Sequence, residues 1–477
     1  MKKNDQLEIV IDNLGNEGEG IGRVDGYALF VKGALPGERV LVSIMKMKKT
    51  YGFARLIEVL NPSPDRVTPP CPVYPRCGGC TLQHLSYAAQ LAFKQQKVTD
   101  CLTRIGGVSL ENVDVLPIIG MDASEKSDDL SAPHWHYRNK AQFPLAASSD
   151  GSSVFAGFFA PHSHNVIPVN DCAIQDSAMS DILKVVTETA TRLNVEAYDE
   201  ATHSGVLRHI FIRKAKATNE IMVCLVINAR RLPHAEDFVT ALADIPGMTS
   251  IYYNVQREQT NKIMGDTAKL LWGETYIRDY IGDISFDISP LSFYQVNPVQ
   301  TAKLYESALN FANLTGNETV WDLYCGIGTI SLFLARHAKR VIGVEIVPDA
   351  IEDAKLNAKE NKITNTEFHC GAAETVVPAL RSQSDYLSAD VVVIDPPRKG
   401  CAQSLISTIL NMAPEKIVYV SCDPATLARD VKLLMAGGLE GEDVKGKVAY
   451  EVKKVQAVDM FPGSGHVETV VLMSKVR

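Results

Sequence analysis

The sequence of 477 residues lacks the features that define several protein classes. It has no apolar run near the ~20 residues that span a bilayer, and its first residues, Met-Lys-Lys-Asn-Asp-Gln, are not followed by the apolar stretch of an export signal. It also lacks excess positive charge, since 48 Lys and Arg against 56 Asp and Glu give a net charge of -8. We therefore expect a cytoplasmic protein that does not bind membranes and that uses a local basic surface for any contact with nucleic acid.

Length and composition predict several ordinary folded domains. Hydrophobic residues make up 46% and charged residues 22% of the chain, which excludes a collagen-like, disordered or disulfide-scaffold protein. At roughly 150 residues per domain, the length predicts about three domains. Ten cysteines occur without an export signal, so we expect free thiols that bind metal, react or pack. No feature indicates an obligate protein partner.

Residues 1–62 have the pattern of a small OB-like β-barrel. Glycine-rich turns separate strand-like runs at Leu7–Leu14, Tyr27–Val31, Val40–Met47 and Tyr51–Leu60. Between Lys32 and Arg55 there are six basic residues and one acidic residue, interleaved with Tyr51 and Phe53. Cations can follow an RNA backbone while aromatic rings stack on bases. A solvated face explains the same charges equally well.

A proline-rich stretch then carries a cysteine cluster. Cys71, Cys77 and Cys80 lie within ten residues, and the last two have Cys-x-x-Cys spacing. This spacing is a strong metal signal, but thiolates bind both zinc and iron–sulfur clusters. A fourth ligand must come from elsewhere. The rest of residues 63–289 mixes strand-like and helix-like runs, which predicts a central α/β domain.

From residue 290 the pattern changes to alternating strands and helices, as in a parallel doubly wound sheet. Asn297-Pro298 has the form of an N-cap followed by proline at the first helical position. Buried-strand runs follow at Thr319–Leu323, Arg340–Val344, Asp390–Ile394 and Lys416–Val420. Residues 290–477 are therefore predicted to form a Rossmann-like domain, with its ligand beyond the carboxyl ends of the strands.

The first two runs end in features of a nucleoside site. A Gly326-x-Gly328 turn follows the first run, and the second ends at Glu345, where such sites place an acid that binds ribose hydroxyls. The turn lacks the third glycine of a dinucleotide fingerprint. S-adenosylmethionine therefore fits better than NAD, and a dinucleotide oxidoreductase is a distant alternative.

The other two runs end in reactive side chains. Asp395 precedes two prolines, which keep a helix from starting at once and leave the carboxylate in the crevice. Cys422 follows the fourth run and is a candidate nucleophile, while Glu468 begins the second of two final strands. A thiol and two carboxylates beside a cofactor turn favour catalysis over coincidence.

The ordered motifs of the chain resemble those of the RNA (uracil-5-)-methyltransferase family, most closely its 23S ribosomal RNA branch. They are Phe-Tyr-Gln-Val-Asn (293–297), Asp-Pro-Pro-Arg-Lys-Gly (395–400), Ser-Cys-Asp-Pro (421–424), Asp-Met-Phe-Pro (459–462) and His-Val-Glu (466–468). The N-terminal barrel resembles the TRAM module, and Tyr-Arg-Asn-Lys-Ala-Gln (137–142) resembles the family's middle domain. The chain departs from many members at Asp423, where they have Asn, and at Ser464, where they have Thr.

The resemblance implies methyl transfer from S-adenosylmethionine to carbon 5 of a specific uridine in 23S ribosomal RNA. Cys422, as thiolate, would add to carbon 6 of the uracil, and Glu468 would remove the carbon 5 proton. A thiol with a pKa of about 8.5 needs a lowered pKa or a nearby base to do so at neutral pH. The cofactor site would be lined by Gln295, Tyr324, Glu345 and Asp395.

The resemblance also implies that Cys172, in its Val-Asn-Asp-Cys context, is the fourth ligand of a 4Fe-4S cluster held with Cys71, Cys77 and Cys80. The remaining cysteines, Cys101, Cys224, Cys325, Cys370 and Cys401, are expected to pack. The expected domains are a TRAM-like RNA-binding barrel (1–62), a central α/β domain with the cluster (63–289) and the methyltransferase domain (290–477). The same reaction on transfer RNA, or a non-catalytic iron–sulfur RNA-binding protein, are the alternatives.

Overall fold

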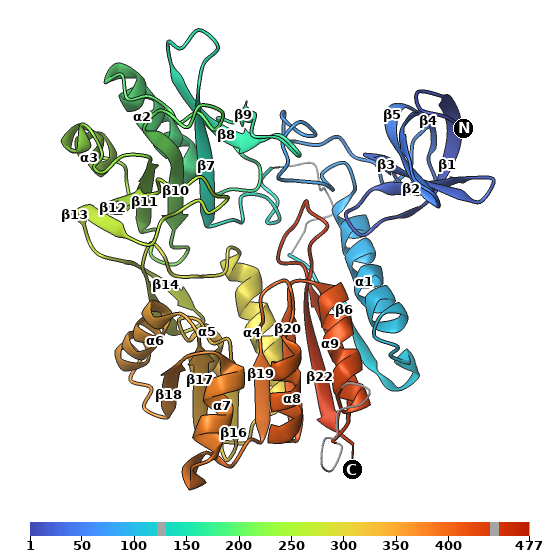
Figure 1. Ribbon diagram of the computed structural model, residues 1–477, viewed down its shortest axis with the longest axis vertical. Helices are drawn as coiled ribbons and strands as arrows, with labels where there is room; N and C mark the ends of the chain where they lie inside the picture. The colour runs from blue at the N-terminus through green and yellow to red at the C-terminus, as the bar shows by residue number, and fades with distance from the viewer. Residues whose placement is uncertain (122–129, 439–447, 477) are drawn as a thin grey trace.

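The computed structural model describes residues 1–121, 130–438 and 448–476, which form three lobes (Figure 1). The first lobe is a closed barrel with strand order β1-β2-β3-β5-β4. Its strands are β1 (Gln6–Leu14), β2 (Gly20–Val24), β3 (Tyr27–Lys32), β4 (Arg39–Met47) and β5 (Tyr51–Asn61). Alternate side chains, such as Ile9 and Ile11, fill its core. Glycines in β2 permit closure, because a Cβ at Gly22 would lie 2.6 Å from the Val10 carbonyl oxygen.

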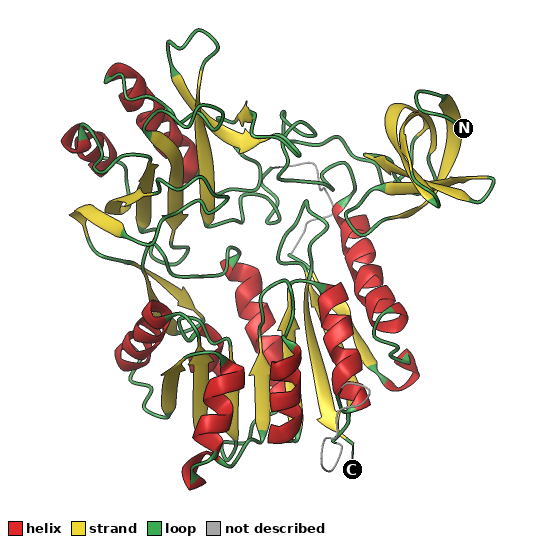
Figure 2. Cartoon of the chain, in the orientation of Figure 1, coloured by secondary structure: helices red, strands yellow, loops and turns green. Residues whose placement is uncertain are grey.

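The central lobe is a mixed sheet with order β13-β12-β11-β10-β7-β8-β9. Its strands are β7 (Lys140–Ala147), β8 (Val154–Phe159), β9 (Val166–Pro168), β10 (Leu207–Lys214), β11 (Ile221–Ile227), β12 (Met248–Val255) and β13 (Ala268–Gly273). Helices α2 (Ala178–Arg192) and α3 (Ala235–Ala243) pack on one face (Figure 2). The other face shares a core with the third lobe, in which Phe211 and Met222 pack with Ile277 and Leu304. Ile277 belongs to the hairpin of β14 (Ile277–Ile281) and β15 (Ile284–Ile288).

The C-terminal lobe is an eight-stranded sheet with order β18-β17-β16-β19-β20-β22-β21-β6. Strands β16 (Thr319–Leu323), β17 (Arg340–Glu345), β18 (Thr366–Cys370), β19 (Val391–Ile394) and β20 (Lys416–Ser421) are parallel. Strand β22 (Glu468–Lys475) runs antiparallel to β20 and to β21 (Tyr450–Val458). This sheet, with the barrel and the mixed central lobe, confirms the predicted α/β fold class.

Helices cover both faces of this sheet. One face packs on α4 (Pro298–Ala312), α5 (Thr329–Ala335) and α6 (Pro348–Glu360). The other packs on α1 (Tyr87–Arg104), α7 (Ala373–Arg381), α8 (Gln403–Met412) and α9 (Pro424–Ala436). The predicted cap of α4 is present, since the Asn297 side chain accepts a hydrogen bond from the Gln300 amide. Within the described residues, no helix has the length and apolar character needed to cross a membrane.

One segment lies with a different lobe from the one its sequence position indicates. Strand β6 (Asp114–Ile119) pairs in parallel with β21 at the edge of the C-terminal sheet, and Val98 and Leu102 of α1 enter the same core. The expected central domain of residues 63–289 therefore contains a segment that packs with the expected catalytic domain. A local sequence pattern cannot reveal this pairing, because the two strands are more than 300 residues apart. The three-domain division remains a proposal.

Candidate active site and cysteine cavity

The carboxyl edge of the parallel strands collects three of the predicted site residues. Leu323, the last residue of β16, pairs with Val344 on one side and with Ile394 on the other. The residues that follow these three positions are Tyr324, Glu345 and Asp395. They therefore lie along one edge of the sheet.

The antiparallel strand β22 brings the fourth and fifth residues to the same edge. Ser421 at the end of β20 pairs with Thr469 near the start of β22. Cys422, which follows Ser421, and Glu468, which precedes Thr469, are consequently neighbours. The Glu468 carboxylate contributes to the raised pKa of Cys422.

The site raises the pKa of its thiol and of both carboxyl groups. Burial is the main cause for Glu468, which is 3% exposed, and the Asp395 carboxylate adds to the rise in the pKa of Glu468. The pKa of Asp395 is raised by burial and by Asp322. Burial, with Glu468 and Asp395, raises the pKa of Cys422 to about 11, while the Arg398 guanidinium opposes the rise. The pKa of the thiol is not lowered, so the alternative route to a thiolate at neutral pH, a nearby base, is the one that this arrangement leaves.

Asp322 is a buried acid that the sequence pattern did not single out. It is 1% exposed on β16, its Oδ2 accepts a hydrogen bond from Ser331 Oγ at 2.5 Å, and its Oδ1 has no partner among the described residues. Burial, together with Glu345, raises the pKa of Asp322 to about 7. The sequence does contain a signal for Asp322, because a charged residue inside an otherwise apolar strand run is costly to bury and so indicates a functional role.

The turn after β16 is shaped as a cradle. Tyr324 has φ +75° and Gly326 φ +55°, and a Cβ added at Gly326 would meet no atom within 4 Å. Both oxygens of Glu345 accept backbone N–H groups, from Gly326 at 3.2 Å and from Val347 at 2.9 Å. Each oxygen retains a lone pair for a further donor. Ile346 beside it is 62% exposed, which adds an apolar surface next to the carboxylate.

Gln295 lies at the junction of two lobes and not on a strand end. It is 8% exposed in the loop that leads into α4. The Asn139 side chain donates to the Gln295 carbonyl oxygen at 3.1 Å, and the Asn139 amide donates to that of Val296 at 2.9 Å. The motif at 137–142 therefore holds the loop that carries Gln295.

The loop of residues 459–467, which leads into Glu468, is held by the segment after the cysteine cluster. The amides of Thr81 and Leu82 donate to the Gly463 carbonyl oxygen at 3.1 and 2.9 Å. The Gly465 amide donates to Thr81 Oγ1 at 3.1 Å. Thr81 directly follows Cys80, so the order of the cysteine segment is linked to the loop that positions Glu468.

Helix α1 holds the same loop from the other side. Lys94 Nζ lies 2.5 Å from Asp459 Oδ1, with neither side chain exposed, and also donates to the Phe461 carbonyl oxygen at 2.9 Å. Lys97 Nζ donates to the carbonyl oxygens of Gly465 at 2.9 Å and of Asn16 in the barrel at 2.8 Å. The loop therefore connects α1, the barrel and the catalytic sheet.

Both departures from the family motifs fall on side chains that stabilise turns. Asp423 is the N-cap of α9, and its carboxylate accepts from the amides of Ala425 at 2.9 Å and Thr426 at 3.2 Å. Asn and Asp cap helices about equally well. Ser464 Oγ donates to the Phe461 carbonyl oxygen at 2.9 Å, which a threonine hydroxyl also does. Each departure therefore preserves its local contact.

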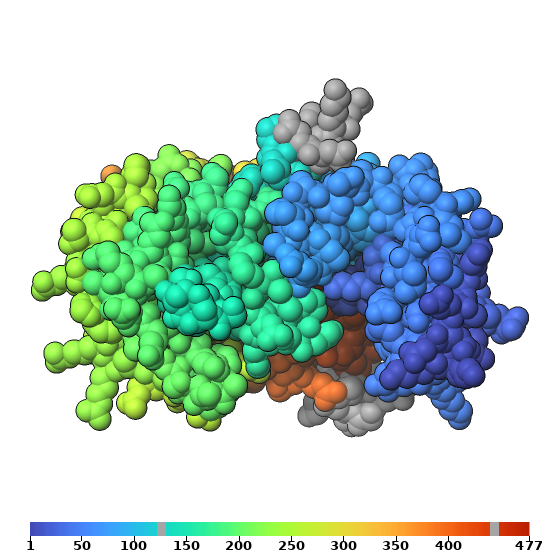
Figure 3. Space-filling view, turned by 90° about the horizontal axis from the view of Figure 1, so that it is seen from above, coloured from blue at the N-terminus to red at the C-terminus, as the bar shows by residue number. Residues whose placement is uncertain are grey.

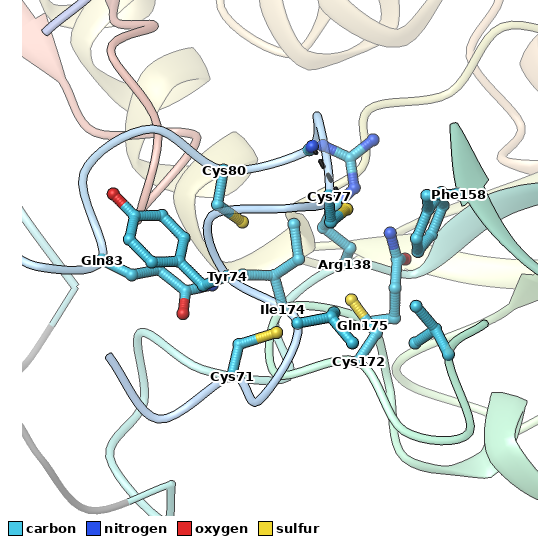
Figure 4. A pocket seen from close by; sticks show the side chains of 13 residues that line it. Cys71, Tyr74, Cys77, Cys80, Gln83, Arg138, Phe158, Cys172, Ile174 and Gln175 are labelled. Atoms are coloured by element: carbon cyan, nitrogen blue, oxygen red, sulfur yellow. Dashed lines mark hydrogen bonds between the residues drawn. The ribbon is translucent and has the colours of Figure 1, made fainter. Parts of the chain in front are cut away.

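The four predicted cluster ligands line one cavity. Cys71, Cys77, Cys80 and Cys172 surround a space of about 190 Å³, with their sulfur atoms turned toward one another (Figure 4). Burial and the neighbouring cysteines raise the pKa of Cys80 to about 12. Of the cysteines expected to pack, Cys101, Cys224, Cys325 and Cys401 are buried, but Cys370 is exposed at the end of edge strand β18.

Comparison with known proteins identifies the chain. The model of the tRNA (uracil-5-)-methyltransferase family matches residues 120–476. The chain belongs to this family. The TRAM domain model matches residues 2–57. The protein is accordingly an RNA methyltransferase that uses S-adenosylmethionine and acts on carbon 5 of uracil.

Its relatives match it over nearly their whole length. An uncharacterized RNA methyltransferase of Halalkalibacterium halodurans is 50% identical, with 99% of this chain and 98% of the relative covered. One from Clostridium tetani is 47% identical, with 99% and 97% covered. The crystal structure of Pyrococcus abyssi tRNA (uracil-54, C5)-methyltransferase with S-adenosyl-L-homocysteine is 26% identical, with a TM-score of 0.74 and with 98% of this chain and 100% of that chain covered.

Proposed function

We propose that this enzyme methylates carbon 5 of a specific uridine in 23S ribosomal RNA through a covalent adduct with Cys422. The observation that carries the chemistry is the placement of Cys422 and Glu468 at adjacent positions of paired strands, beside Asp395. The ribosomal substrate is supported by the resemblance of the motifs to that branch of the family.

Cys422 begins the reaction by attacking carbon 6 of the uracil. Its proton passes to a nearby carboxylate, and the thiolate forms an S–C6 bond while the electron pair moves to carbon 5. When bound, S-adenosylmethionine supplies the methyl group that carbon 5 accepts. Glu468 then removes the carbon 5 proton and the S–C6 bond breaks as the carbon 5–carbon 6 double bond re-forms. The departing thiolate recovers the first proton from the carboxylate that held it, and Glu468 releases the second proton to solvent. A stacked base hides carbon 6, so the target uridine must be unpaired or flipped out.

The residues at the strand ends fit S-adenosylmethionine. The open cradle at Gly326 and the free lone pairs of Glu345 suit a nucleoside with ribose hydroxyls. The carboxylates of Asp322 and Asp395 suit a positively charged sulfonium, because an adjacent cation offsets their mutual repulsion. We propose that Gln295, Tyr324, Glu345 and Asp395 line this site.

The cysteine cavity offers four thiols and room for a group larger than one atom. Its volume of about 190 Å³ is several times the ~30 Å³ share of one water molecule. In the described parts of the chain, no three or more His, Cys, Asp or Glu side chains are close enough together to hold a metal ion as they stand, so the four thiols surround a space and not a preformed ion site. We propose that Cys71, Cys77, Cys80 and Cys172 hold a 4Fe-4S cluster, which orders the Thr81–Leu82 segment against the loop before Glu468.

Transfer RNA is the second candidate substrate. The Pyrococcus abyssi enzyme is described as acting on transfer RNA, and its structure covers 98% of this chain. A three-part architecture of this kind therefore does not by itself separate ribosomal from transfer RNA.

Labelled S-adenosylmethionine, incubated with anaerobically purified protein and unmodified 23S ribosomal or transfer RNA, tests both points. Label as 5-methyluridine in ribosomal RNA alone supports the proposal, and label in transfer RNA alone overturns the substrate. Cys422→Ala is expected to abolish turnover and the covalent RNA adduct, with the exposed Cys370→Ala as the matched control. Normal methylation by Cys422→Ala would falsify the mechanism.

A further inference from the structure

The barrel carries a cavity that neither its core nor the catalytic site explains. Its volume is about 450 Å³, within the ~300–1,000 Å³ typical of ligand pockets. Its lining combines aromatic residues of β3 and β5 with polar residues of the turn between β1 and β2. The lining residues are Phe30, Tyr51, Phe53, Ala28, Asn16, Glu17 and Glu19.

The three rings form a single open cluster. Phe30 pairs with Phe53 across β3 and β5, and Tyr51 lies two residues before Phe53, so all three rings are on the same face. The ring centroids are 5.6–5.8 Å apart, and the Tyr51 ring lies edge-on to the rings of Phe30 and Phe53. Tyr51 is 38% exposed. Unpaired bases of RNA stack on exposed aromatic side chains of this kind.

The polar side selects which base fits. Carboxylates accept hydrogen bonds and donate none, so Glu17 and Glu19 favour a base edge with N–H groups and repel phosphate. The basic side chains of Lys32 and Arg55, which are paired positions on β3 and β5, are available to bind the RNA phosphates. Guanine offers its ring N–H and its 2-amino group side by side, which lets one carboxylate accept both. The other three bases lack this pair of donors.

The cavity adjoins the loop that positions Glu468. Lys97 Nζ joins Asn16, at the edge of the cavity, to Gly465 in the loop. A Cβ added at Gly465 would lie 3.4 Å from the Glu17 backbone. Viewed from above, the C-terminal lobe is visible between the barrel and the central lobe (Figure 3). A nucleotide in the cavity is therefore close to the loop of residues 459–467, which leads into Glu468 at the start of β22.

We propose that this barrel cavity binds an unpaired guanine of the substrate RNA close to the methylated uridine. The proposal rests on the proposed function only in taking RNA as the ligand. The base stacks on Phe30 and Phe53, the Tyr51 ring, which is nearly perpendicular to both, contacts its edge, and Glu17 and Glu19 accept its N–H groups. The cavity thus contributes to the choice of the methylated site.

Binding of short RNA to the full-length protein tests the site without any methyl transfer. The probes are fluorescently labelled oligouridines with one central guanine, inosine, adenine or cytosine, and anisotropy is the readout. Inosine lacks the 2-amino group of guanine, so the wild type is expected to bind the guanine probe about tenfold more tightly. Glu17→Gln with Glu19→Gln should remove that preference, so that the guanine and inosine probes bind the variant with equal affinity.

Loss of a stacking ring is expected to weaken binding of the guanine probe about tenfold. Tyr51→Ala removes one ring, and Phe53→Leu keeps an apolar side chain so that the barrel stays folded, which a thermal melt verifies. Val10→Ala and Glu58→Gln are matched controls, because both side chains are exposed on barrel strands outside the cavity.

Equal affinity of the wild type for all four probes, or no binding of any probe, would overturn the proposal. So would unchanged affinity in folded Tyr51→Ala and Phe53→Leu variants. The methylation assay reports separately on the proposed function. An enzyme that methylates RNA without guanine preference refutes the cavity alone, whereas guanine binding without methyl transfer refutes the reaction alone.

Discussion

The buried ion pair between α1 and the loop before Glu468 makes Lys94 a sensitive position for stability. Lys94 and Asp459 are both fully buried with 2.5 Å between Nζ and Oδ1. Removing one partner of a buried pair leaves an uncompensated charge and costs about 3–5 kcal/mol. We expect Lys94→Ala to lower the free energy of unfolding by that amount, out of a typical total of ~5–15 kcal/mol. The corresponding fall in melting temperature is roughly 6–20 °C.

Urea and thermal unfolding followed by circular dichroism measure this effect. Lys355→Ala is the matched control, because Lys355 is also a helical lysine in an ion pair but its side chain is 51% exposed, so its loss should cost less than about 1 kcal/mol. Replacing both partners, as Lys94→Met with Asp459→Val, should recover most of the loss because no unpaired charge remains. Equal destabilisation by Lys94→Ala and Lys355→Ala would refute the reasoning.

Three further predictions concern the catalytic groups and the cysteines. A general base must be ionised to accept a proton. Because burial and the Asp395 carboxylate raise the pKa of Glu468 to about 8, kcat/KM should rise as the pH increases through that value. A kcat/KM profile that falls over this pH interval contradicts the role of Glu468 as the base. The Arg398 guanidinium counteracts the raised pKa of both Cys422 and Glu468, so Arg398→Ala should shift the profile to higher pH and Arg398→Lys should largely restore it. Cys172→Ser should lower both bound iron and melting temperature, while Cys370→Ser at an exposed thiol should change neither; equal iron content in the two variants would remove Cys172 from the ligand set.

Continuous apolar runs made the inner strands of the catalytic sheet predictable. Strands β16, β19 and β20 are buried on both faces, because helices cover the sheet on each side. Such strands have nearly continuous hydrophobic sequences, and Asp322 in β16 is the exception. Asp395 and Cys422 directly follow two of these runs. The prediction that these two residues share an edge follows from strand direction alone.

Strands at the edges of the sheets lack the apolar runs that made the inner strands predictable. Strand β18 has one buried residue, Phe368, and β6 is mostly exposed or half-buried. Both are positioned by pairing with strands that the chain contributes elsewhere. Strand β2 has glycines where neighbouring strands approach closely, and its sequence therefore has the pattern of a turn.

By itself, the sequence determined the α/β class, the strand-end residues, the cap of α4 and the cysteine motif, since each depends on neighbouring residues. Only the tertiary structure decided the electrostatics of the site. The pKa of Cys422 is raised because burial and two carboxylates, from β22 and from the residue after β19, act on it. The contact between the segment after Cys80 and the loop at Gly463 likewise joins residues more than 350 positions apart. Motifs and helix caps depend on residues that are neighbours in the sequence, whereas burial of a side chain and the charges around it are set only when distant segments pack together.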